Sequence, residues 1–189
     1  MEKVEKSMNI YGLPYREEDL EIAVSFPNVH FPPWDSAVDF ILPEGVEILA
    51  ALDGEVVQVM DDSSEGGLDD KYRDVKYMNL ITIKHENNEL TQYIHLQHKS
   101  AKIKIGDRVK KGQVIGLVGN TGLSGRPHLH FHVLKLDKSK IGFHVLAIKF
   151  EKKIKVDKST PKLPKGFDKV IDEAKREWEE TKEKGYVKK

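Results

Sequence analysis

Three histidines stand at every second position in GRPHLHFHV, residues 125–133. Side chains alternate between the two faces of a β-strand, so His128, His130 and His132 share one face and the apolar residues between them share the other. The chain has no cysteine, so any metal must be bound by histidine and carboxylate ligands. The segment predicts a strand with one core face and one face of imidazoles, on which His130 and His128 are candidate functional residues. His132 lies farther along, where we expect it to support the site or to face the surface.

A fourth histidine lies in TQYIHLQH, residues 91–98. Strict alternation along a strand would place Thr91, Tyr93 and His95 on one face. His95 stands in a strand that is otherwise suited to burial, so it is either a site residue or a hydrogen-bonded histidine of the core. Taken alone, His95 is better explained as a hydrogen-bonded histidine of the core than as a site residue.

Carboxylates and one more histidine occur in HFPPWDSAVDF, residues 30–40. Asp39 stands in an apolar, strand-like context, where a carboxylate must be paired or bound to a metal to offset its desolvation. A catalytic zinc ion takes three protein ligands and leaves a fourth position for water. His30, Asp35 and Asp39, together with the histidines farther along, supply the residue types that a zinc hydrolase needs.

These residues must be positioned by strands. Turn signals alternate with short apolar runs, and we expect strands within 36–60 and at 79–85, 90–96, 113–118 and 127–136. Short strands at this spacing predict an all-β sheet or sandwich. The polar segment 61–78 is expected to be a surface loop over or beside the site, or a solvated connection.

Composition excludes some classes. The 189 residues suffice for one domain, and 31 basic side chains balance 31 acidic ones, which gives no argument for nucleic acid or an acidic membrane surface as a partner. Residues 1–22 carry scattered charges and no apolar core of signal-peptide length, and no later run is long enough to span a membrane. We therefore expect no export signal in this sequence.

The composition changes after Lys152. We predict one domain over residues 1–152, a proline-containing linker over 153–166, and a helix and tail over 167–189. Apolar residues of the helix recur at helical spacing and are expected to pack on the β-domain or on a partner; they are Phe167, Val170, Ile171, Ala174 and Trp178.

The chain resembles the lysostaphin/LytM-type zinc metallopeptidases, a family of endopeptidases that cleave peptidoglycan. The resemblance covers roughly residues 13–150 and is strongest in IGDRVKKGQVIGLVGNTGLSGRPHLHFHV, residues 105–133. It extends to VDFILPEGVEILAALDGEVVQV, residues 38–59, and to Y-x-H-L at 93–96. It implies the antiparallel all-β fold of the lysostaphin catalytic domain, here with a C-terminal helix appended.

The resemblance also implies site residues. Zinc would be bound by His30, Asp39 and His130, while His95 and His128 would be catalytic histidines that do not bind the metal. The commonest family spacing places the first histidine four positions before the aspartate, where this chain has Asp35. A branch of the family has a longer spacing that fits His30, and Asp35 is the alternative third ligand.

The implied reaction is hydrolysis of a peptide bond by a zinc-activated water, with His128 as proton acceptor and donor and His95 stabilising the oxyanion or orienting the water. Family members cut cell-wall peptidoglycan and usually act outside the cytoplasm, so the missing export signal leaves the compartment open.

Two other readings remain. The first is a non-catalytic domain of this family that binds wall peptides or activates another hydrolase. The second is a biotinyl or lipoyl carrier. The carrier has weaker support, because its lysine would stand at a tight hairpin tip, and a long polar loop and further strands lie between the two half-motifs here.

Overall fold

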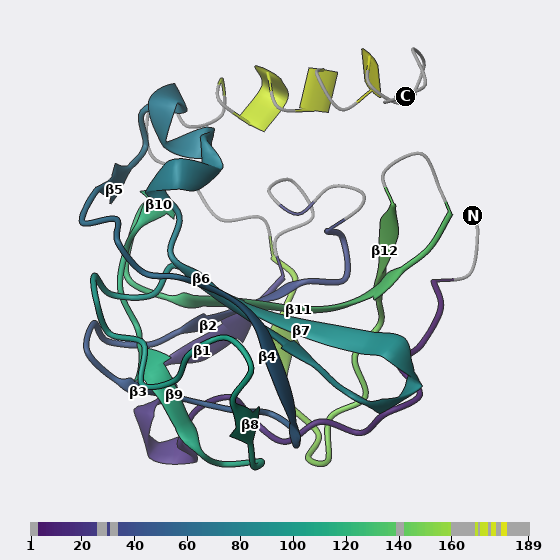
Figure 1. Ribbon diagram of the computed structural model, residues 1–189. Helices are drawn as coiled ribbons and strands as arrows, with labels where there is room; N and C mark the ends of the chain where they lie inside the picture. Colours follow the sequence, from purple (N-terminus) through teal and green to yellow (C-terminus); the bar gives the residue numbers. More distant parts are fainter. Residues whose placement is uncertain are drawn as a thin grey trace.

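The structure of the chain is a computed structural model made mainly of short β-strands (Figure 1). It describes residues 4–25, 30, 34–138, 142–159, 169, 171–173, 175–176 and 179–180. The predicted all-β class is confirmed.

Thirteen strands occur in the described ranges: β1 (Ile22–Val24), β2 (Val38–Ile41), β3 (Glu47–Leu49), β4 (Gly54–Met60), β5 (Gly66–Gly67), β6 (Leu80–Lys84), β7 (Glu89–Ile94), β8 (Arg108–Val109), β9 (Val114–Leu117), β10 (Gly122–Leu123), β11 (Leu129–Leu136), β12 (Phe143–Leu146) and β13 (Val156–Asp157). Short 3-10 helices lie before β1 and between later strands: η1 (Glu17–Asp19), η2 (Asp70–Arg73), η3 (Val75–Tyr77) and η4 (Glu86–Asn88). Each strand segment expected from the sequence overlaps at least one of these strands.

One large sheet has the strand order β13-β1-β2-β11-β7-β6-β4-β8, and β12 also pairs with β11. The strand β11 is central, because its first half pairs with β2 and its second half with β12, while β7 runs along its other edge. Two small sheets pair β3 with β9 and β5 with β10. The segments that carry the candidate site residues therefore meet in the middle of the large sheet (Figure 1).

The two faces of β11 differ as the sequence predicts. Leu129, Phe131 and Val133 are fully buried in the hydrophobic core, and the histidines point to the opposite face. The strand begins at Leu129, so His128 lies just before it.

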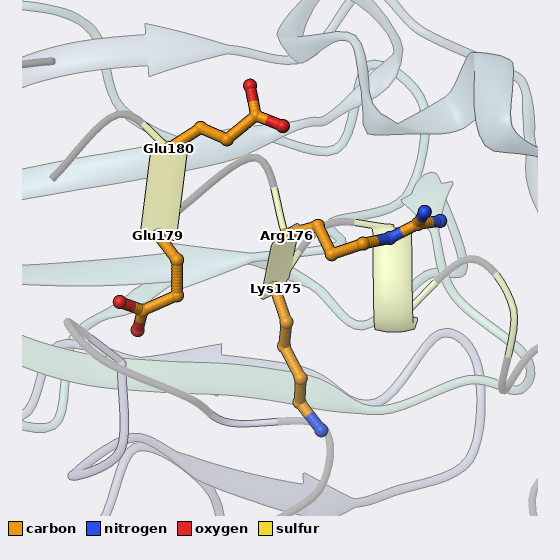
Figure 2. Close-up of a pocket in the computed structure, with 4 residues that line it drawn as sticks. All are labelled: Lys175, Arg176, Glu179 and Glu180. Carbon is orange, nitrogen blue, oxygen red and sulfur yellow. The ribbon is translucent and has the colours of Figure 1, made fainter. Parts of the chain in front are cut away.

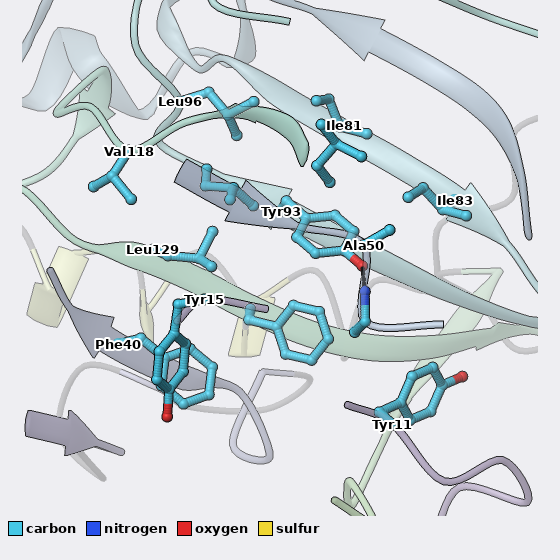
Figure 3. Close-up of a cluster of buried hydrophobic side chains, with 14 of the residues drawn as sticks. Tyr11, Tyr15, Phe40, Ala50, Ile81, Ile83, Tyr93, Leu96, Val118 and Leu129 are labelled. Carbon is cyan, nitrogen blue, oxygen red and sulfur yellow. Dashed lines mark hydrogen bonds between the residues drawn. The ribbon is translucent and has the colours of Figure 1, made fainter. Parts of the chain in front are cut away.

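The core includes Leu129, Phe131 and Val133 of β11, and Figure 3 shows a part of it. The rings of Tyr93 and Phe131 lie 5.2 Å apart, and Phe40 packs against Phe131 from β2. The buried hydroxyl of Tyr93 accepts a hydrogen bond of 2.8 Å from the backbone N–H of Ala51, which satisfies its polar atom inside the core. This packing fixes the register of the three strands that hold the site.

The C-terminal segments add to this fold. Within the segment predicted as a linker, β13 pairs in parallel with β1. The described residues between Lys169 and Glu180 are helical and lie at the top of Figure 1, beyond β5 and β10. Ile171, one of the apolar residues predicted to pack, is buried; Phe167, Val170, Ala174 and Trp178 lie outside the described residues.

Candidate metal centre

The register between β2 and β11 places Asp39 directly opposite His130, with both side chains on the same face. The Nδ1 atom of His130 lies 2.9 Å from Oδ1 of Asp39. Asp39 is buried, so its carboxylate requires close partners to remain charged.

His30 completes a cluster of three donors. Its Nε2 atom lies 3.2 Å from Oδ2 of Asp39, and its ring centroid lies 5.0 Å from that of His130. One donor atom from each of His30, Asp39 and His130 lies within 4.8 Å of the other two. The buried Nδ1 atom of His30 has no hydrogen-bond partner among the described residues.

The charge of this cluster suits a cation. Burial disfavours the charged form of Asp39, but His30, His128 and His130 around it hold its pKa well below the usual value. Burial lowers the pKa of His130, and the carboxylate of Asp39 raises the pKa of His30 against the effect of burial. Two imidazoles and one ionised carboxylate form a donor set that Zn²⁺ prefers.

Asp35, the alternative third ligand, is exposed, whereas Asp39 is buried. The donor cluster consists of His30, Asp39 and His130, and Asp35 does not belong to it.

His95 lies beside this cluster in an unusual backbone conformation. It follows the last residue of β7 and has a φ of 68°, in the left-handed region. Its backbone N–H donates to the carbonyl of Asn79 at 3.0 Å, and its carbonyl accepts from Gly119 at 3.0 Å. The alternation expected from the sequence is therefore wrong at His95: Tyr93 points into the core, whereas the ring of His95 lies 6.1 Å from that of His130 on the other face.

The ring of His95 is oriented by the segment before β10. Its Nδ1–H donates to the carbonyl of Thr121 at 2.6 Å, which leaves Nε2 without a proton in the neutral ring. Burial, together with the nearby His128 and His130, holds the pKa of His95 well below its usual value. At neutral pH, His95 is thus an acceptor at Nε2.

His128 is oriented in the same way. Its Nδ1–H donates to the carbonyl of Arg126 at 2.9 Å, and Nε2 lies 3.7 Å from Oδ1 of Asp39. The ring centroids of His128 and His95 lie 4.6 Å apart. Two histidines therefore stand beside the donor cluster, each with Nδ1 engaged by a backbone carbonyl.

Several supporting residues were missed at the level of sequence. Asn79 is buried, donates from Nδ2 to the carbonyl of Leu96 at 3.1 Å, and receives at its backbone carbonyl the N–H of His95. Thr121 supplies the carbonyl that orients His95. In the sequence, Asn79 is a polar residue at the start of an apolar strand, and Thr121 stands in the G-N-T-G turn. Neither pattern indicates which group the residue binds.

The polar segment 61–78 contains β5, η2 and η3, and β5 pairs in parallel with β10. Gly122 of β10 directly follows Thr121, which binds His95. The pairing of β5 with β10 places part of the segment next to Thr121, and the segment has more local structure than the expected loop.

A pocket of about 360 Å³ lies at the C-terminal helix, where it is lined by Lys175, Arg176, Glu179 and Glu180 (Figure 2). The four side chains extend in different directions from the helix. A second pocket of about 530 Å³ is lined by residues near β1 and 152–157. Neither pocket includes His30, Asp39 or His130 among its lining residues.

A His-Asp-His set, of which His30 and Asp39 are buried, thus lies beside two histidines whose rings are oriented by backbone carbonyls. The model of Peptidase family M23 matches residues 34–141, which is more than half of the chain, and the chain belongs to this family. The match includes Asp39, His95, His128 and His130; His30 lies just before it.

Two curated relatives illustrate the similarity. The peptidoglycan DD-endopeptidase ShyC of Vibrio cholerae is 38% identical over 96 residues, which are 51% of this chain and 19% of that protein. The glycyl-glycine endopeptidase ALE-1 of Staphylococcus capitis is 34% identical over 94 residues, which are 50% of this chain and 23% of that protein. The chain spans about a fifth of the length of these relatives.

A solved structure of a zinc containing peptidase from Vibrio cholerae shares the fold. It has a TM-score of 0.51 and 24% sequence identity, and the similarity covers 78% of this chain and 41% of that one.

Among the described residues, no helix combines the length and apolar character needed to cross a membrane.

Proposed function

We propose that this chain is a zinc-dependent endopeptidase that hydrolyses peptide bonds in the cross-links of peptidoglycan. The observation that carries the proposal is the cluster of His30, Asp39 and His130, with His95 and His128 beside it. Family membership supports a metallopeptidase. The substrate class rests on relatives named as peptidoglycan and glycyl-glycine endopeptidases.

His30, Asp39 and His130 would hold the zinc ion. When bound, zinc polarises the carbonyl of the scissile bond and lowers the pKa of a water molecule toward about 7. The donor set fits such a site, because donor atoms of two imidazoles and a buried carboxylate lie within 4.8 Å of one another and a cation would offset the desolvation of the carboxylate.

His128 would move the proton. Its Nδ1–H is held by the carbonyl of Arg126, so the neutral ring offers a bare Nε2 that can accept a proton from water. The same atom can then deliver that proton to the nitrogen of the leaving amine. Histidine suits both steps because its ordinary pKa, about 6.5, lies near neutral pH.

For His95 the geometry supports one of the two expected roles. Nδ1–H is engaged by Thr121, and burial keeps the ring neutral, so Nε2 accepts rather than donates a hydrogen bond. An acceptor orients a water molecule, whereas stabilising an oxyanion needs a donor. His95 would therefore orient the attacking water.

The test begins with the zinc content of protein purified without added metal, measured by elemental analysis. We expect about one zinc ion per chain, and its loss in His30→Ala and in His130→Ala. Asp35→Ala is the matched control, because this exposed carboxylate lies in the same segment and should leave the zinc content unchanged. Zinc retained in His30→Ala and lost in Asp35→Ala would transfer the ligand role to Asp35.

The second step is hydrolysis of purified peptidoglycan, with cross-linked DD-peptides and glycyl-glycine peptides as separate substrates. Cleavage that disappears with a zinc chelator and returns with Zn²⁺ supports the proposal. A zinc-loaded chain that binds peptidoglycan without cleaving any bond would instead make it a non-catalytic binding domain.

A further inference from the structure

We infer that His132 and Gln92 are positioning residues, which direct the Nδ1 atom of His130 toward the metal through a chain of hydrogen bonds across the sheet. The inference rests on the proposed function, because it assigns His130 as a zinc ligand. It concerns residues beyond the three donors and the two catalytic histidines.

The sheet register brings these side chains into one row. His132 on β11 is the cross-strand partner of Gln92 on β7, and Gln92 is the partner of Thr82 on β6. A register shift after Val56 on β4 makes Gln58 the partner of Thr82. Cross-strand partners share a face, so four adjacent strands contribute one polar side chain each to the row.

The contacts in this row are continuous. His130 Nε2 lies 3.2 Å from His132 Nδ1, and His132 Nε2 lies 2.9 Å from Gln92 Oε1. Gln92 Nε2 donates to Thr82 Oγ1 at 3.0 Å, and Thr82 Oγ1 donates to Gln58 Oε1 at 3.0 Å. His132 and Thr82 are almost fully buried. Buried polar groups arranged in this way have few other partners.

The direction of donation follows from the amide of Gln92. Its nitrogen is used by Thr82, so its oxygen faces His132 and requires a proton on His132 Nε2. The neutral ring of His132 then has a bare Nδ1, which accepts from Nε2–H of His130. The neutral ring of His130 consequently has a bare Nδ1.

The bare Nδ1 of His130 lies 2.9 Å from the carboxylate of Asp39. Two acceptors at this distance repel each other unless a proton or a metal ion lies between them, and a zinc ion held by both residues would remove that repulsion. Histidine ligands generally donate their other N–H to a partner that fixes the tautomer and the ring orientation. His132 is that partner here, and Gln92 fixes the tautomer of His132 in turn.

The test compares zinc affinity in wild type, His132→Phe and Gln92→Leu by competition with a chelator at one pH. His132→Phe keeps a ring and removes both nitrogens, and we expect zinc affinity to fall about 10–100-fold. Gln92→Leu should weaken binding in the same direction by a smaller factor. Gln92→Glu keeps an acceptor for His132 and should restore the wild-type affinity.

The matched control is His85→Phe, the same substitution at another buried histidine, which hydrogen-bonds to Asp53 and Thr91 away from the donor cluster. It should lower stability and leave zinc affinity unchanged. Long-range ¹H–¹⁵N spectra of the zinc-loaded protein should show His130 protonated at Nε2, with a shifted His132 signal in Gln92→Leu.

The inference would be overturned if His132→Phe bound zinc as tightly as His85→Phe does. It would also be overturned if Gln92→Glu lost as much zinc affinity as Gln92→Leu. If His132→Phe does not fold, the Gln92 pair and the spectra decide alone. A wild type that binds no zinc refutes the proposed function and the inference together, whereas tight wild-type binding with unaffected variants refutes only the positioning role.

Discussion

At the scale of single residues, the backbone of His95 determines where its ring lies. A φ of 68° turns the chain out of the strand alternation and brings the imidazole to the face of His128 and His130. Residues other than glycine adopt this conformation uncommonly, and asparagine, aspartate and histidine do so more often than the rest, so it carries a modest cost that the surrounding hydrogen bonds offset. Asparagine is the residue best suited to replace His95 without moving the backbone.

We therefore expect His95→Asn to fold and to retain zinc, while kcat falls by about 10²-fold or more because the acceptor for water is lost. His128→Ala should retain zinc and lose about 10²–10⁴-fold in kcat, because it removes the proton acceptor. Elemental analysis and steady-state cleavage of peptide substrates measure the two quantities. Loss of zinc in either variant, or unchanged kcat in both, would contradict these roles.

His85 provides a test of buried-histidine energetics away from the site. Burial lowers its pKa, while Nδ1–H donates to the carbonyl of Asp53 and Nε2 accepts from the hydroxyl of Thr91. The unfolded chain binds a proton at His85 at higher pH than the folded chain, with an ordinary pKa of about 6.5. The contribution of neutral His85 to stability is thus complete above that pH and is lost as pH falls through the lowered pKa.

His85→Gln, which keeps a donor and an acceptor, should remove this dependence. Urea unfolding of chelator-treated protein between pH 8 and pH 5 should show the wild type losing more stability than the variant below about pH 6.5. Parallel curves for the two proteins would show that His85 does not titrate on unfolding.

At the scale of elements, the end of β7 and the segment after β9 approach each other closely at Gly119. A Cβ atom on Gly119 would lie 2.4 Å from the backbone N and 2.5 Å from the Cα of Gln97. The N–H of Gly119 also donates to the carbonyl of His95. This close approach couples the spacing of the two elements to the position of His95, for which we propose a catalytic role.

Gly119→Ala should therefore lower the free energy of unfolding by about 1–3 kcal/mol, since backbone must shift to admit the methyl group. It should also reduce kcat, because His95 moves with the displaced segment. Gly12→Ala is the control, since the added atom would meet a flexible Lys111 side chain at 3.2 Å and the carbonyl oxygen of Ala51 at 3.3 Å. Urea unfolding and cleavage assays should separate the two variants; equal effects would argue against the coupling.

At the scale of the whole molecule, an N-terminal arm is held against the β-domain. Buried Glu89 at the start of β7 accepts from the N–H of Met8 at 2.5 Å and from the hydroxyl of Tyr11 at 2.8 Å. Bridges of Lys6 with Ala147 and of Tyr11 with Phe150 align the arm with the chain that follows β11. The fold thus includes residues well before the region matched by the family, which begins at residue 34.

Tyr11→Phe removes one hydrogen bond to a buried carboxylate and should cost about 1.5–3 kcal/mol of stability. Zinc content and kcat should stay unchanged, because Tyr11 contacts Glu89 at the start of β7, whereas His95 follows the other end of that strand. Urea unfolding measures the first effect, and the zinc and cleavage assays measure the others. A variant as stable as the wild type would show that the arm contributes little to the fold.

Much of the fold follows from local patterns. Alternation of apolar residues with histidines indicated a strand with a core face at Leu129, Phe131 and Val133, and the structure confirms it. The strand β13 was not expected in the predicted linker, because its pairing with β1 depends on a segment more than a hundred residues earlier. Local propensity carries no information about such a partner.

The sequence by itself determined the residue types available for chemistry: histidines and carboxylates without cysteine, on strands of an all-β domain. Only the tertiary structure decided which of them meet. Strand alternation is local, so it predicted the faces of β11. The cluster of His30 with Asp39, the turned backbone of His95 and the row from His132 to Gln58 instead depend on register and on hydrogen bonds between distant segments, which alternation along one strand does not encode.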